Sequence, residues 1–129
     1  MVTVELRTYQ KCAMINITKQ VKDAVMKSGV KEGLVTVHCP HTTAGITVNE
    51  NADPDVVTDL LAAMEELVPK INYRHAEGNS SAHLKAALTG CSTVVPVHGG
   101  EIALGVWQGI YFCEFDGPRN RRFFVQATG

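Results

Sequence analysis

The stretch EIALGVWQGIYFCEF, residues 101–115, decides the fold class of this 129-residue chain. From Ile102 to Phe115 it shows little alternation between polar and apolar side chains. A strand of this kind is usually covered on both faces. We expect helices to cover one face, and in a domain this small another subunit is a candidate for covering the other. Trp107 is expected in the core or an interface rather than stacked on a ligand ring.

Shorter segments that alternate or are rich in β-branched residues surround this stretch and predict further strands. They are residues 2–9, 33–39, 45–50, 92–98 and 121–127. Together with the helices described next, they predict an α+β fold: a mostly antiparallel sheet with about three helices. The length predicts a single compact domain over residues 1–129.

Three helices are predicted from capping residues and apolar periodicity. Thr18 is expected to cap the first helix, and Gly29 to end it. Asp53 is expected to cap the second, with Pro54 at the favoured first position. The third covers residues 80–90. The apolar sides of the first two helices are expected to comprise Val21, Ala24, Val25 and Met26, and Val56, Val57, Leu60, Leu61, Met64 and Leu67.

The composition excludes several classes of partner. Twelve Lys and Arg against thirteen Asp and Glu give a net charge of −1, so no global field favours nucleic acid or an acidic membrane. The chain shows neither a signal-peptide pattern nor an apolar run long enough for a membrane helix, so a cytoplasmic location is expected.

The cysteines have no CxxC spacing and are expected to be buried, reduced thiols: Cys12, Cys39, Cys91 and Cys113.

Polar residues cluster in predicted loops, and the histidines among them suggest two kinds of chemistry. His41, His75 and His83 lie in loops or just inside a helix. Three imidazole nitrogens and one open position form a catalytic zinc arrangement, so one hypothesis is a metal centre. Alternatively, these histidines cap, hydrogen-bond, or bind an anionic substrate when protonated. His38 and His98 end strands and are expected to be structural or surface groups.

The segment EGNSS, which starts at Glu77, predicts a turn at Gly78 and a helix cap at Asn79 or Ser80. The first amides of the helix would suit a phosphate, and Lys85, one turn further on, would add positive charge. An ordinary cap without a ligand explains the same letters equally well. Glu77 is a ligand, a general base or a solvated loop acid.

Two further clusters follow predicted strands. The hydroxyls of Thr42 and Thr43 are expected either to bind phosphate oxygens or to make ordinary turn hydrogen bonds. Asn49, Glu50 and Asn51 form a polar run at a strand end, which fits a site better than a core.

The segment FDGPRNRR predicts a turn that projects Arg119, Arg121 and Arg122. Guanidinium groups bind phosphate in a bidentate manner, although a solvated hairpin is the simpler alternative. Asp116 or Glu114 would instead suit Mg²⁺, which prefers oxygen ligands.

Three long segments, HTTAGITVNENADPDVVTDL, HAEGNSSAHLKAALTG and LGVWQGIYFCEFDGPRNR, resemble one family closely in this order. The chain is similar to the YjbQ family, also called the secondary thiamine-phosphate synthase family, from about residue 8 to residue 129. The resemblance implies a small α+β protein that associates as a homotrimer. It also implies weak thiamine-phosphate synthase activity, which couples a pyrimidine pyrophosphate to a thiazole phosphate with loss of pyrophosphate.

The resemblance places a composite site at His41, Thr42, Thr43, Asn49, Glu50, His75, Glu77, Asn79, His83, Asp116 and Arg119. Combined with the chemistry of the residues, it assigns expected roles in three groups. Catalytic roles fall to His41, Glu77, His83 and Asp116. Substrate or phosphate binding falls to Thr42, Thr43, Asn49, Glu50, Asn79, Lys85 and Arg119. A divalent metal, zinc or magnesium, would be held by His41, His75 and His83.

Three hypotheses about function stay open at this point. The first is a metal-assisted transferase that acts on thiamine precursors. The second is a metal-dependent hydrolase or phosphatase, with Glu77 or Asp116 as the base toward a metal-bound water. The third is a non-catalytic module that binds a small phosphorylated metabolite or a partner.

Overall fold

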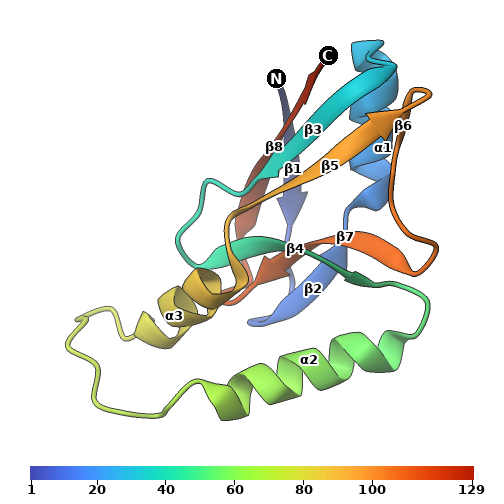
Figure 1. The fold of residues 1–129 in the computed structure, drawn as a ribbon. Helices are drawn as coiled ribbons and strands as arrows, with labels where there is room; N and C mark the ends of the chain where they lie inside the picture. The colour runs from blue at the N-terminus through green and yellow to red at the C-terminus, as the bar shows by residue number, and fades with distance from the viewer.

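The structure, a computed structural model, describes residues 1–129 and consists of two β-sheets and three helices (Figure 1). Sheet A has five strands in the order β1-β8-β3-β5-β6, and sheet B has three in the order β2-β7-β4. All strand pairs are antiparallel, which confirms the predicted α+β class. The strands are β1 Val2–Arg7, β2 Ala13–Asn16, β3 Glu32–His38, β4 Ala44–Glu50, β5 Ser92–His98, β6 Glu101–Ile102, β7 Gln108–Glu114 and β8 Asn120–Thr128. The helices are α1 Thr18–Ser28, α2 Pro54–Leu67 and α3 Ser80–Thr89.

The main core lies between the two sheets and α1. Along β3 and β8, alternate side chains point into it, among them Val35 and Phe123, which are fully buried. β7 contributes Phe112 and α1 contributes Val21, also fully buried. The ring centroids of Phe112 and Phe123 are 6.2 Å apart, so the two sheets meet through an aromatic pair.

The stretch 101–115 is not one continuous strand, as the sequence suggested, but two strands separated by a turn. Gln108 N donates to Gly105 O at 3.0 Å, and the Gln108 side chain accepts from Gly105 N at 2.8 Å. These bonds close the turn between β6 and β7. Trp107 lies in this turn and is 62% exposed, so it does not belong to the core. Gln108, a polar residue inside the apolar run, therefore lies where the turn between the two strands closes.

β7 is covered on both faces, as expected, but by parts of the same chain. Phe112 points into the main core. Tyr111 and Cys113, on the other face, form a smaller cluster with Ala82 and Ala86 of α3. No second subunit is needed to cover this strand, contrary to one of the sequence-based alternatives.

Close contact between α3 and β4 fixes the C-terminal end of α3. A Cβ atom at Gly45 would lie 2.5 Å from the carbonyl oxygen of Gly90, so the approach requires glycine. The same oxygen accepts a hydrogen bond from Ile46 N at 3.0 Å. The helix is therefore attached to the first residues of β4, next to the loop that carries His41.

The first helix begins differently from the prediction. Thr18 does not cap it; instead, Asn16 Oδ1 accepts from both Thr18 N, at 3.0 Å, and Thr18 Oγ1, at 2.6 Å. Thr18 Oγ1 in turn accepts from Ile110 N at 2.9 Å. Gly29 ends the helix in the left-handed conformation, as predicted. Met26, placed on the apolar side, is 72% exposed.

The second helix begins as predicted but is not buried. Asp53 Oδ1 accepts from Asp55 N at 2.9 Å, and Pro54 is the first helical residue. No residue of α2 is buried, and Leu67 is 68% exposed, so its apolar stripe is incompletely covered within one chain. Figure 1 shows α2 as a separate layer beyond β2.

No helix combines the length and apolar character needed to cross a membrane.

All four cysteines are free, but only Cys39 and Cys113 are buried, while Cys91 is exposed. Burial raises the pKa of the Cys113 thiol to about 12.

Candidate functional site

A cavity of about 390 Å³ lies where three loops meet. They are the β3–β4 connection, the segment before α3 and the β7–β8 turn. We call it the polar cavity, because nine of its ten lining residues have polar side chains. Its lining residues are Pro40, His41, Thr42, Thr43, His75, Glu77, Asn79, His83, Arg119 and Arg121. Eight of the predicted site residues are thus brought together, together with Arg121.

Two predicted histidines are neighbours in this cavity. The rings of His75 and His83 have centroids 5.4 Å apart and pack edge to face. His83 is in the first turn of α3, and His75 precedes a tight turn in which Gly78 N donates to His75 O at 3.1 Å. Gly78 has φ +76°, which glycine adopts without strain. The sequence correctly predicted this turn.

Asn79 precedes α3 but does not cap it through its side chain. Its Nδ2 donates to Asp116 Oδ2 at 3.0 Å, and its Oδ1 is buried without a hydrogen-bond partner. No side chain caps the amides of Ser80 and Ser81. The positive end of the α3 dipole is therefore uncompensated beside the cavity, together with an unused acceptor.

Arg119 is held at the cavity by Asp116. Arg119 Nη2 donates to Asp116 Oδ2 at 2.8 Å, and Arg119 Nε donates to Asp116 O at 2.8 Å. Asp116 Oδ2 therefore accepts hydrogen bonds from both Arg119, in the β7–β8 turn, and Asn79, in the segment before α3. Since both its neighbours are donors, Asp116 is better placed to position them than to act as a free base.

Arg121 is a buried residue of β8 that lines the inner side of the cavity. Its Nη2 donates to Thr43 Oγ1 at 2.8 Å, and its Nε donates to Glu114 Oε1 at 2.8 Å. Thr43 is 5% exposed, so its hydroxyl orients Arg121 instead of facing a ligand. Thr42, by contrast, is exposed and free to contact one.

Glu114 is fully buried and is not a magnesium ligand of the kind the sequence suggested. Thr8 Oγ1 donates to its Oε1 at 2.7 Å, and the amides of Phe115 and Asp116 donate to its Oε2 at 3.1 Å each. Burial alone would raise the pKa of this carboxyl, but the hydrogen bonds from Arg121, Thr8 and Asp116 N outweigh it and hold the pKa below its ordinary value. Both oxygens are occupied by protein donors.

His41 forms the wall of the cavity in a defined tautomer. Its Nε2 accepts from Arg122 N at 3.0 Å, so the neutral ring carries its proton on Nδ1. Burial and the charge of Arg121 lower the pKa of His41, which favours this neutral form. With one nitrogen accepting and the other protonated, His41 has no lone pair left for a metal or for general-base chemistry.

The expected three-histidine metal centre is not assembled in this structure. No group of three His, Cys, Asp or Glu side chains is arranged to hold a metal ion. All three histidines line the polar cavity, but only His75 and His83 are in ring contact, while His41 Nε2 accepts from Arg122 N.

Four predicted site residues are not among those that line the polar cavity; one of them, Asp116, lies beside it and binds Asn79 and Arg119. Lys85 is 4% exposed and pairs with Glu65 of α2, so it points away from the cavity. Asn49 and Glu50 end β4, about 20 Å along the strand from Thr43 at ~3.3 Å per residue. Asn49 Oδ1 accepts from Glu50 N at 2.8 Å, and Asn49 lines a separate cavity between α2, α3 and sheet B.

Thr8 was missed by sequence reasoning. It is 1% exposed, and its hydroxyl both donates to Glu114 and accepts from Arg119 N at 3.0 Å. Its partners are more than a hundred positions away, so no local pattern could have indicated its role.

Comparisons with known proteins agree over the whole chain. Residues 2–129 match the family model described as UPF0047 protein YjbQ-like. The UPF0047 protein YugU of Bacillus subtilis is 46% identical over 129 residues, covering 98% of each chain. A crystal structure of an uncharacterised YjbQ/UPF0047 protein from Clostridium acetobutylicum is 51% identical, with a TM-score of 0.96, over 99% of this chain and 100% of that one. A conserved hypothetical protein from Thermus thermophilus is 42% identical, with a TM-score of 0.90 over the same shares.

Proposed function

This chain belongs to the UPF0047 YjbQ-like family, and from that premise we propose that its polar cavity binds the phosphate groups of small metabolites for transferase chemistry. The observation that carries the proposal is the uncapped start of α3, which lies beside a cavity that Asn79, His83 and Arg119 line. Free helix amides and a guanidinium are the donors that phosphate oxygens require.

The other lining groups support the same chemistry. Thr42 is exposed and supplies a hydroxyl donor. His75 and His83 supply ring N–H donors in a cavity whose other lining side chains, apart from Pro40, are polar. The unpartnered Oδ1 of Asn79 offers an acceptor for a donor group of the ligand.

The reaction we propose is of the thiamine-phosphate synthase type implied by the sequence resemblance. The ring nitrogen of a thiazole phosphate forms a C–N bond to the methylene carbon of a pyrimidine pyrophosphate. The C–O bond to pyrophosphate breaks, and pyrophosphate leaves with the electron pair. The protein then needs no nucleophile of its own; its task is to align the two molecules and stabilise the leaving group with Arg119, His83 and the α3 amides.

A homotrimer is part of this proposal. Pro40 has the only apolar side chain that lines the polar cavity, so the cavity offers little apolar surface for the two aromatic rings of such substrates. Elsewhere the chain exposes large apolar side chains, among them Val106 at 84% and Trp107 at 62%. Exposed apolar surface of this kind marks interaction sites. A neighbouring subunit would cover it and complete the binding site for the rings.

The paired histidines favour one alternative, a hydrolase or phosphatase that recruits a divalent ion. His75 and His83 are the residues that would hold zinc, with Glu77 of the same cavity as a base toward a bound water. Elemental analysis of the purified protein and of His75→Ala tests this alternative. Zinc that is present in the wild type and lost in the variant would favour it over the transferase.

The transferase is tested by coupling the two thiamine precursors in vitro. We expect His83→Ala to lose most of the activity, because it removes a leaving-group contact, whereas His98→Ala, an exposed histidine at the end of β5, should retain it. Equal traces of product from wild type and His83→Ala would reject the transferase. Phosphate binding without product would instead leave a module that only binds a phosphorylated metabolite.

A further inference from the structure

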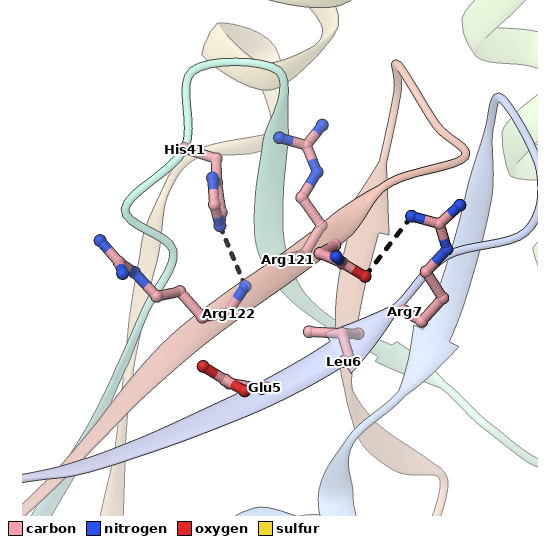
Figure 2. A pocket seen from close by; sticks show the side chains of 7 residues that line it. Glu5, Leu6, Arg7, His41, Arg121 and Arg122 are labelled. Atoms are coloured by element: carbon pink, nitrogen blue, oxygen red, sulfur yellow. Dashed lines mark hydrogen bonds between the residues drawn. The ribbon is translucent and has the colours of Figure 1, made fainter.

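A second cavity, of about 520 Å³, lies on the other side of His41 (Figure 2). We call it the basic cavity; it is lined by Glu5, Leu6, Arg7, His41, Asn120, Arg121 and Arg122. His41 and Arg121 line both cavities, so the two share one wall. The backbone bond from Arg122 N to His41 Nε2 holds that wall in place.

Strand pairing gathers the charges of the basic cavity on one face of sheet A. In the antiparallel register, Glu5 lies opposite Arg122 and Arg7 lies opposite Asn120. Side chains at opposite positions share a face, and residues two apart along a strand do as well. The main core lies on the other face, because Phe123, next to Arg122, is fully buried.

The two outer arginines of this cavity have no acidic partner. None of the four ion pairs of the chain includes Arg7 or Arg122. Arg7 Nη1 donates only to Asn120 Oδ1, at 3.4 Å, and the Arg122 guanidinium lies over the Phe124 ring, 5.8 Å from its centroid. Two guanidinium groups against one carboxylate, Glu5, leave the hollow with a net positive charge.

Arg121 lines both cavities but adds no net charge to the basic cavity, because it forms an ion pair with Glu114. The donors available to a ligand are therefore the guanidinium groups of Arg7 and Arg122 and the amide of Asn120. These are the groups that bind phosphate oxygens most directly. Figure 2 shows Arg7 and Arg122 at opposite ends of the hollow, with Glu5 between them at its edge.

We propose that the basic cavity is a second phosphate subsite, so that the complete site takes one phosphorylated group on each side of His41. This inference rests on the proposed function and adds to it the place where a second phosphorylated group binds. The substrates would be two phosphorylated molecules that react across His41, or one molecule with two separated phosphates. The polar cavity would hold the group that departs, and the basic cavity would anchor the group that stays.

Titration with inorganic phosphate, followed by calorimetry and by amide NMR shifts, tests this inference. The wild-type protein should bind phosphate at two sites per chain, shifting the amides of Ser80 and Ser81 and, separately, those of Arg7 and Asn120. Arg7→Gln/Arg122→Gln should weaken the second site about tenfold or more and leave the first unchanged. The matched control, Lys19→Gln/Lys27→Gln, removes two exposed charges from α1 and should bind like the wild type.

The outcomes separate this inference from the proposed function. If phosphate shifts only Arg7 and Asn120, the basic cavity is confirmed and the proposed role of the polar cavity fails. If the arginine variant and the lysine control give the same isotherm as the wild type, the second subsite is rejected. Both variants change exposed side chains, so equal thermal midpoints will show that each is folded. A bisphosphate that binds one per chain, and tighter than two phosphates, identifies a single bridging ligand.

Discussion

Arg121 and Glu114 form an ion pair whose side chains are 3% and 0% exposed, directly beneath the polar cavity. Arg121 Nε donates to Glu114 Oε1 at 2.8 Å, and Arg121 Nη2 donates to the second carboxylate oxygen and to Thr43 Oγ1. The pair joins β7 to β8 at the point where both cavities share a wall. It therefore couples the stability of the fold to the shape of the candidate site.

Removing the charge of Glu114 should destabilise the fold strongly. Glu114→Gln leaves the Arg121 guanidinium buried without a counter-charge, which should cost about 3 kcal/mol or more of unfolding free energy. Urea denaturation measures the loss. The matched variant Glu101→Gln changes an exposed carboxylate that takes part in no ion pair, and should stay within about 0.5 kcal/mol of the wild type. Equal losses in both variants would contradict the proposed role of the buried pair.

The same carboxylate predicts a pH dependence. The pKa of Glu114 is lower in the folded protein than in the unfolded chain, where it is about 4.3. Its contribution to stability is therefore fully present above that value and is lost as the pH falls through the lower, folded pKa. In urea titrations from pH 7 to acid, the difference between wild type and Glu114→Gln should shrink only below about pH 4. A difference that does not change with pH would show that the pKa of Glu114 is the same in the folded and unfolded states, contrary to this prediction.

His41 should stay neutral under mildly acidic conditions. Burial and the charge of Arg121 lower its pKa, and Nε2 accepts from Arg122 N. Nitrogen-15 NMR of the ring should show the proton on Nδ1, and the imidazole should titrate below the ordinary histidine value of about 6.5. Exposed His98, whose hydrogen bond to Glu32 raises its pKa, should titrate above that value in the same spectra. A proton on Nε2 of neutral His41 would contradict the described wall between the cavities.

Lys85 should matter for packing and not for ligand binding. Its ammonium pairs with Glu65, whose side chain is 53% exposed, so the pair ties α3 to α2 at the edge of solvent. Lys85→Met keeps the aliphatic stem and should cost about 1 kcal/mol of unfolding free energy, because the half-exposed partner is screened by water. Phosphate affinity, measured by calorimetry, should be unchanged. A large loss of affinity in a folded variant would return Lys85 to the phosphate site.

Local patterns predicted what is locally determined, and failed where distant residues decide. Asp53 and Pro54 marked the start of α2 because a cap and a first-turn proline act on their own helix. Gly29 and Gly78 were predicted for the same reason. Thr18 is a capping residue by type, yet its hydroxyl is bound to Ile110 N, 92 positions away.

The candidate site shows the same division. The loop from His75 to His83 was identified as its centre, and both histidines line the cavity. Lys85, one helical turn further, was assigned by proximity along α3, but the packing of α2 turns it toward Glu65. The polar run at Asn49 lies at the end of β4, whereas the start of β4 lies next to the cavity. The sequence could not show which end would lie at the site; the pairing of β4 with β7 does.

Trp107 provides the test of assembly. It lies in the turn between β6 and β7, 62% exposed, next to Val106 at 84%, so both side chains are largely uncovered within one chain. If the proposed homotrimer buries this turn, Trp107→Glu would force a charge into an apolar contact and should dissociate the assembly. Light scattering should give about three times the 14.0 kDa chain mass for the wild type and a lower mass for the variant. Met26→Glu, a similar change on α1 at a side chain that is 72% exposed, should leave the mass unchanged. A wild-type mass of one chain would reject the trimer, and an unchanged trimer in Trp107→Glu would place the interface on another surface, such as the uncovered face of α2.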